Sequence, residues 1–148
     1  MREIRTDIEI DAPPRVVWEV LTDLDAYAEW NPQTTNASGA VREGERVAIT
    51  VDRQGRRSAS MRPRVVEADP ERRLEWVATV LHPRLFEARH SFELDALDGD
   101  RTRVHNRERL SGVLVRFLVD EDAVRAYEAM NRALAARVAS LVAESRTA

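Results

Sequence analysis

The sequence predicts a single α+β domain in which a long C-terminal helix packs against an antiparallel sheet of about seven strands. Three observations predict this class. The chain has 148 residues, a length that favours one domain with a substantial core. Several segments between residues 4 and 110 alternate apolar and polar side chains, as is typical of strands with one buried face. Residues 124–141 instead carry apolar side chains at helical spacing.

The N-terminal part predicts one strand followed by two short helices. Residues 4–10 alternate isoleucine or threonine with charged residues, which indicates a half-buried strand. Pro14 suits the first turn of a helix whose apolar stripe lies within residues 16–21. A second short helix, over residues 24–30, is expected to end before Pro32, because the residue preceding a proline avoids the helical region.

The middle of the chain predicts consecutive strands with short connections. Residues 47–51, 64–68 and 74–80 form three such runs, and a turn is expected around Gln54-Gly55. No repeat, low-complexity stretch or linker interrupts the pattern. We therefore expect residues 1–148 to form one domain.

Residues 84–112 predict a long hairpin. Its inward face on the first strand carries Phe86, Ala88, His90, Phe92 and Leu94, and on the second strand Thr102, Val104, Asn106, Glu108 and Leu110. A three-residue connection ending at Gly99 brings these two faces together. It places Phe92 opposite Val104 and His90 opposite Asn106, with Glu108 diagonal to His90.

The C-terminal segment predicts a helix of about six turns. Asp120-Glu121-Asp122 would place negative charge in its first turn, where the helix dipole favours it. An apolar stripe then follows, formed by Val124, Tyr127, Met130, Leu134, Val138 and Leu141. A long helix with one apolar face must cover apolar surface, and the inner face of the strands is the candidate.

Three polar residues, His90, Asn106 and Glu108, fall on the otherwise apolar inner face. Burial of a carboxylate costs free energy unless it is hydrogen-bonded or paired, so this group is either a satisfied structural network or a site that orients a ligand. An apolar pocket would raise the pKa of Glu108 towards values useful for proton transfer. Glu108 and His90 are therefore the candidate catalytic residues.

Composition excludes several classes of function. The chain contains no cysteine and no lysine, which excludes thiolate and Schiff-base chemistry. A net charge of -3 argues against nucleic-acid binding, and the histidines do not converge on a metal site. We expect no metal and no cofactor. The sequence shows no apolar run long enough for a membrane span and no signal-peptide core, so we expect a cytoplasmic protein.

Short motifs along nearly the whole chain resemble a known superfamily. They are Ile8-Glu9-Ile10-Asp11-Ala12-Pro13-Pro14, Val17-Trp18, Leu21-Thr22-Asp23, Tyr27 with Trp30-Asn31-Pro32, residues 69–76, residues 90–94, Glu108 with Gly112, and residues 130–134. They are similar to the START and birch-pollen-allergen-like (SRPBCC) superfamily, and within it to polyketide cyclase/dehydrase-like proteins. The resemblance implies a helix-grip fold, in which a curved sheet grips the terminal helix around a cavity for a small hydrophobic molecule.

The resemblance also places Trp30 and Asn31 at one wall of that cavity. Beside His90, Asn106 and Glu108, the other candidates for its lining are Ile49, Val65, Trp76, Phe86, Phe92, Tyr127, Met130, Asn131 and Leu134. For several of them a role in the core is the alternative: Trp30 can simply cap the core, and aromatic residues at alternate strand positions usually pack inside it.

Three functions remain open from the sequence. The first is the binding of a small hydrophobic ligand, resembling a polyketide, a lipid or an aromatic compound, without chemistry. The second is a cofactor-independent cyclase or dehydratase that uses Glu108 and His90 as acid and base. The third is a protein-interaction module, since related helix-grip domains include a co-chaperone. The sequence predicts neither the ligand nor the oligomeric state.

Overall fold

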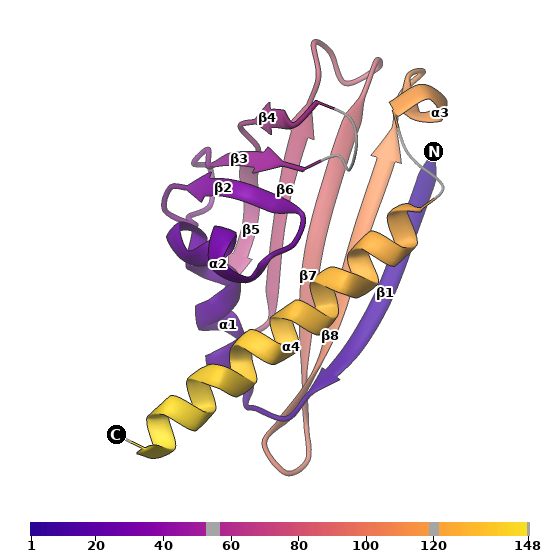
Figure 1. Cartoon of the computed structure of the whole chain (residues 1–148). Coiled ribbons are helices and arrows are strands. Elements are labelled where there is room, and N and C mark those ends of the chain that lie inside the picture. The colour runs from indigo at the N-terminus through magenta and orange to yellow at the C-terminus, as the bar shows by residue number, and fades with distance from the viewer. Residues whose placement is uncertain (53–56, 119–121, 148) are drawn as a thin grey trace.

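The computed structural model describes residues 1–52, 57–118 and 122–147 and is shown in Figure 1. Its elements in chain order are β1 (Arg2–Ile10), α1 (Pro14–Thr22), η1 (Leu24–Ala26), α2 (Tyr27–Trp30), β2 (Thr34–Ser38), β3 (Ala48–Val51), β4 (Ala59–Met61), β5 (Arg64–Asp69), β6 (Arg73–Thr79), β7 (Glu87–Leu97), β8 (Arg101–Ser111), α3 (Val115–Leu118) and α4 (Ala123–Thr147). The predicted α+β class is confirmed.

The strands of the described residues form two antiparallel sheets. Five strands form a large sheet in the order β1-β8-β7-β6-β5, and β2, β3 and β4 form a small one. Two of these strands, β2 and β4, are absent from the strands predicted by the alternation pattern. The sequence of β2 is mostly polar, and β4 has only three residues, so neither shows a usable alternation.

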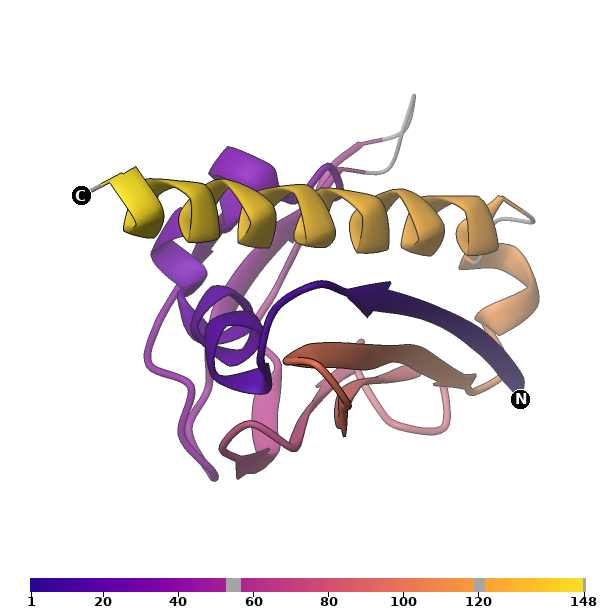
Figure 2. The same cartoon turned by 90° about the horizontal axis from the view of Figure 1, so that it is seen from below.

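Helix α4 runs along one face of the large sheet, and no helix of the described residues lies on the opposite face (Figure 2). The predicted packing is confirmed, since Met130, Leu134 and Val138 on the apolar stripe of α4 are buried in the core. Each large apolar side chain buried in this way contributes roughly 1.5–3 kcal/mol to folding. No helix in the described ranges has the length and apolar character needed to cross a membrane.

The N-terminal helices close one end of the molecule beside the small sheet (Figure 1). Pro14 opens α1 as predicted, and Val17, Val20 and Leu21 on its apolar stripe are buried. Helix α2 ends at Trp30, immediately before Asn31-Pro32, as predicted. The Tyr27 hydroxyl donates a hydrogen bond of 2.5 Å to the Leu21 carbonyl, which ties α2 back to α1.

The register of the β7–β8 hairpin differs from the prediction by two residues. Phe92 pairs with Asn106, and His90 pairs directly with Glu108. The connection consists of residues 98–100, not 97–99, and both Gly99 and Asp100 adopt positive φ angles of 75° and 58°. A shift of two residues keeps every side chain on its predicted face, so the inward set is unchanged.

Two sequence predictions fall outside the described residues. They are the turn at Gln54-Gly55 and the acidic Asp120 and Glu121 at the start of the C-terminal helix. The connection before that helix contains the short helix α3, which the sequence pattern did not indicate.

Candidate functional site

A cavity of about 570 Å³ lies between the inner face of the large sheet, the small sheet and α4. Its volume falls within the roughly 300–1,000 Å³ typical of small-molecule sites. The lining residues are Ile4, Tyr27, Asn31, Pro32, Gln33, Thr34, Ile49, Val51, Asp52, Ala59, Ser60, Met61, Trp76, Ala78, Val80, Phe86, Ala88, His90, Phe92, Glu108, Leu110, Asp122, Ala123, Ala126, Tyr127 and Met130. Most of these side chains are apolar, as a cavity for an apolar molecule requires.

Nine of the residues singled out from the sequence lie on this wall. They are Asn31, Ile49, Trp76, Phe86, His90, Phe92, Glu108, Tyr127 and Met130. Strands, α4 and loops all contribute to this set, and the inward faces of β6, β7 and β8 supply His90, Glu108 and the aromatic residues beside them.

Five other candidates lie outside the lining. Val65 and Leu134 are fully buried in the core. Val65 lies on the outermost strand β5, where it pairs with Trp76, and Leu134 lies further along α4, so neither belongs to the cavity lining. Trp30 packs edge-on against Tyr27 at a ring distance of 5.1 Å. Asn106 and Asn131 lie behind the cavity wall, where they form part of a buried hydrogen-bond chain.

The remaining wall residues were not named as candidates for the lining. Strand alternation already placed Ala88 and Leu110 on the inward face of the hairpin, and Ala78 lies on the same face of the sheet. Val51 likewise belongs to the alternating run that forms β3. The residues contributed by β2, β4 and the loop before β2 gave no such signal, since those parts of the sequence show little alternation.

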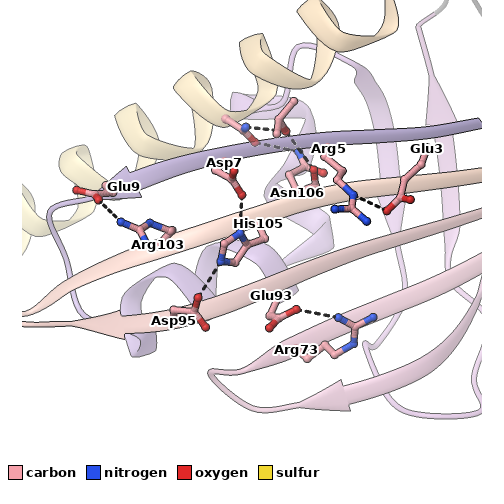
Figure 3. A network of polar contacts seen from close by, with 12 residues as sticks. Glu3, Arg5, Asp7, Glu9, Arg73, Glu93, Asp95, Arg103, His105 and Asn106 are labelled. Carbon is pink, nitrogen blue, oxygen red and sulfur yellow. Dashed lines mark hydrogen bonds and ion pairs between the residues drawn. The ribbon is translucent and has the colours of Figure 1, made fainter.

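A buried hydrogen-bond chain connects β1, β8, α4 and β7 behind the cavity. The Thr6 hydroxyl donates to the Asn106 backbone carbonyl at 3.1 Å, and the Asn131 amide donates to the Thr6 hydroxyl at 2.9 Å. The Asn106 amide donates in turn to Asn131 Oδ1 at 2.9 Å. Finally, Asn106 Oδ1 lies 2.6 Å from His90 Nε2. Figure 3 shows Asn106 within this chain, beside β1.

The direction of the chain fixes the tautomer of His90. A backbone carbonyl only accepts hydrogen bonds, so the Thr6 hydroxyl must donate to it and accept from Asn131. Each amide then presents its nitrogen to one neighbour and its oxygen to the other, which leaves Asn106 Oδ1 facing His90. Because that oxygen is an acceptor, His90 Nε2 carries a proton. The other ring nitrogen, Nδ1, faces the Glu108 carboxyl.

His90 and Glu108 form a close pair at the cavity wall. Nδ1 of His90 lies 3.2 Å from Oε2 of Glu108, and both side chains are about nine-tenths buried. Burial raises the pKa of Glu108 above its ordinary value, whereas the charge of His90 and a hydrogen bond from the Tyr127 hydroxyl act in the opposite direction. The predicted rise is thus confirmed. The pKa of Tyr127 is raised by burial and by the Glu108 carboxylate.

Aromatic rings hold the His90 imidazole in place. Phe92 stacks on it with ring centres 4.5 Å apart, and Tyr127 meets it edge-on at 5.4 Å. Trp76 also meets it edge-on, at 5.9 Å. These contacts and the bond to Asn106 limit rotation of the ring, so Nδ1 stays directed at Glu108.

His105 lies on the opposite face of the sheet, as the parity of its strand predicts. Its ring nitrogens lie 2.5 Å from Asp7 and 2.7 Å from Asp95. Figure 3 shows His105 between these two carboxylates. Ion pairs such as Glu9 with Arg103 surround it. Within the described ranges, no three His, Asp or Glu side chains are placed to hold a metal ion.

A second hollow, of about 600 Å³, borders the cavity on the side of β3 and β4. It also includes Arg46 and Arg62, and the residues it shares with the cavity are Ile49, Ser60, Met61, Ala78 and Val80. The His90–Glu108 pair is not part of its lining.

The fold and the cavity define a helix-grip domain of the START-like (SRPBCC) class. Residues 1–143 match the family model described as polyketide cyclase/dehydrase and lipid transport, and the chain belongs to this family. The sequence has no match among curated proteins.

Solved structures with this fold come from several bacteria. A START superfamily protein from Mycobacterium smegmatis has a TM-score of 0.75 and 18% identity, covering 94% of this chain and 98% of its own. The hypothetical protein jhp0584 from Helicobacter pylori has a TM-score of 0.78 and 16% identity, with coverage of 93% and 88%. The protein TTHA0849 from Thermus thermophilus has a TM-score of 0.75 and 20% identity, with coverage of 95% and 99%. The TM-scores establish a shared fold, and at such low identities the likeness shows the fold alone.

Proposed function

We propose that the protein binds one small, mostly apolar molecule in the 570 Å³ cavity, with the polar end of that molecule at the His90–Glu108 pair. One observation carries the proposal: Oε2 of Glu108 is a buried acceptor on the cavity wall that lacks a hydrogen-bond partner among the described residues. An unpaired buried acceptor costs about 1–3 kcal/mol, more for a charged group. A ligand that donates to this oxygen would recover that cost, while its apolar body covers the remaining wall.

A cavity-filling variant tests this proposal. Ala88 lines the cavity on β7, and Ala88→Phe would occupy part of the volume. Ala96→Phe, at an exposed position on the same strand outside the cavity lining, is the matched control. We expect the wild type and the Ala96→Phe variant to bind the neutral dye Nile red with one-to-one stoichiometry, and Ala88→Phe to bind at least tenfold more weakly. Equal affinity of all three proteins would refute binding in this cavity.

Native mass spectrometry of protein purified gently from its own host extends the test to the natural ligand. An apolar compound at one-to-one stoichiometry would identify the ligand class. Its loss from the Ala88→Phe variant, with retention by the Ala96→Phe variant, would place it in the cavity.

Acid–base catalysis without a cofactor is the second candidate function. It is supported by the 3.2 Å separation of His90 Nδ1 and Glu108 Oε2 on the wall of the cavity. Such a pair can take a proton from the carbon beside a carbonyl and return it to a departing hydroxyl, which is the chemistry of a cyclase or dehydratase. Glu108→Gln is then expected to abolish turnover while ligand binding survives. An equal loss of turnover and binding contradicts catalysis by this residue.

The protein-interaction function has no comparable observation in its favour, and the cytoplasmic location expected from the sequence stays a prediction. The ligand types named from the sequence, a polyketide, a lipid or an aromatic compound, are distinguished by the mass-spectrometric experiment.

A further inference from the structure

The polar atoms at the inner end of the cavity are acceptors rather than donors. His90 Nε2 is used by Asn106, and its Nδ1 faces Glu108 Oε2, so the imidazole offers no free N–H to a ligand. The Tyr127 hydroxyl donates to Glu108. What is left for a ligand is Oε2 of Glu108, which has no hydrogen-bond partner in the described part of the chain.

The net charge of the pair points to the same kind of ligand. Nδ1 of His90 and Oε2 of Glu108 are 3.2 Å apart, and no hydrogen bond joins them. With His90 protonated at Nε2 alone and Glu108 ionised, the pair is an anion, and one further proton makes it neutral. In both states the pair carries no net positive charge that would offset the charge of a carboxylate.

The charge of the lining points in the same direction. The chain has 23 basic residues, all arginine, and none of them appears in the described lining. A buried anionic ligand requires a cation or several donors for compensation, and the described part of the lining contains no arginine to supply that cation.

One unpaired donor does lie on the wall. Gln33 Nε2 has no hydrogen-bond partner among the described residues. A single neutral amide suits a carbonyl or ether oxygen, but it does not offset the charge of a carboxylate. Gln33 therefore fits an uncharged acceptor elsewhere on the ligand.

From these observations we infer that the cavity selects apolar molecules whose polar end is a hydrogen-bond donor, namely an alcohol, a phenol or a protonated amine, and rejects carboxylates such as fatty acids. The donor meets Glu108 Oε2, and the body of the molecule lies against the apolar wall. This inference rests on the proposed binding function and adds the chemical class of the ligand.

A ligand series with one aromatic body, three polar ends and a hydrocarbon control tests the inference. The probes are 9-methylanthracene, 9-anthracenemethanol, 9-(aminomethyl)anthracene and 9-anthracenecarboxylate, with the corresponding naphthalenes as a smaller series, titrated at pH 7 and followed by fluorescence. We expect the alcohol and the amine to bind at least tenfold more tightly than the carboxylate. In Glu108→Gln, which can donate from its amide, this ratio should fall to within threefold. Glu93→Gln, on the opposite face of β7, should leave it unchanged.

Each other outcome overturns a defined part of the argument. A carboxylate that binds as tightly as the alcohol, while the hydrocarbon also binds, overturns the inference and leaves the proposed function standing. Selectivity that persists in Glu108→Gln overturns the assignment to Glu108, since the aqueous cost of burying a carboxylate would then explain it. Failure of every probe in both series, including the hydrocarbons, overturns the binding function and the inference together. Carboxylate binding at Arg46 and Arg62 in the second hollow is identified by its insensitivity to Ala88→Phe.

Discussion

His90 and Glu108 occupy directly paired positions on β7 and β8, with Nδ1 of the first 3.2 Å from Oε2 of the second. One oxygen of the pair is left without a partner. Asn106 fixes the imidazole through Nε2, whereas Oε2 of Glu108 faces the cavity without a hydrogen-bond partner in the described residues. A fixed imidazole beside a buried carboxyl oxygen without a hydrogen-bond partner is an arrangement that stability alone does not favour, which supports a role in binding or proton transfer.

Glu108→Gln is expected to stabilise the protein increasingly as the pH rises. Burial raises the folded-state pKa of Glu108 above its ordinary value of 4.5. The folded state therefore binds more protons than the unfolded state between those two pKa values, and wild-type stability falls as pH rises through that window. Glutamine does not titrate, so the gain of the variant over wild type should be smallest near pH 4.5 and largest above the folded pKa.

Urea unfolding of wild type and variant at pH values from about 4.5 to 8.5 measures this difference. Glu93→Gln, on the outer face, serves as the control and should show no such rise. A difference that is constant with pH, or that shrinks as pH rises, contradicts a raised pKa at Glu108.

Asn106→Leu is expected to destabilise the fold by about 2–4 kcal/mol, because it leaves partners in a fully buried chain without hydrogen bonds. Asn131 Oδ1 would lose its donor, and His90 Nε2 would lose its acceptor. Asn36→Leu, at an exposed position on β2, is the matched control and should change stability by about 0.5 kcal/mol or less. Chemical denaturation measures both. A loss below about 0.5 kcal/mol in Asn106→Leu would show that the chain contributes little.

Strand alternation predicted which side chains face inward but not which of them meet. A period of two assigns His90, Asn106 and Glu108 to one face in any register that differs by an even number of residues. The choice between these registers depends on which loop residues adopt left-handed backbone conformations. Asp100 does so in addition to Gly99, and the pattern of apolar residues carries no information about it.

The limits of the site prediction have a similar origin. The apolar stripe of α4 includes Tyr127 and Met130, which reach the cavity, and Leu134, which is fully buried outside its lining. Helical spacing identifies the stripe but not the point along the helix where the sheet curves away from it. Two strands of the small sheet, β2 and β4, were missing from the prediction because they are short or mostly polar, and the small sheet supplies the opposite wall.

Gly112→Ala is expected to lower the free energy of unfolding by about 2–4 kcal/mol. This loss is larger than the strain of a positive φ angle alone would cause. Gly112 has a φ of 110°, and a Cβ there would overlap the backbone carbonyl of Leu85. The amide of Leu114 bonds to that same carbonyl at 3.0 Å, so the two segments have little freedom to separate. Displacement of this loop would also move the adjacent Phe86, which lines the cavity.

Gly44→Ala is the control for the backbone term. Gly44 also has a positive φ, of 86°, but a Cβ there meets no atom within 4 Å. Its substitution should cost about 1–2 kcal/mol. Thermal and urea unfolding measure both variants. Equal losses at the two positions would contradict a steric role for the contact with Leu85.

His105 is expected to stabilise the fold in a manner that fades as pH rises. Burial lowers its pKa, but hydrogen bonds to Asp95 and Asp7 outweigh that effect and raise the pKa above its ordinary value of 6.5. A group whose folded-state pKa is raised contributes its full stabilisation below the unfolded pKa and loses it as pH rises through the folded pKa. The difference in unfolding free energy between wild type and His105→Gln should therefore be largest below about pH 6.5 and decline above it.

His82→Gln, at an exposed turn position, should show no comparable decline. Because Asp7 and Asp95 are half exposed or more, about 0.5 M salt should reduce the effect, and a difference that grows with pH would contradict the role of the two carboxylates.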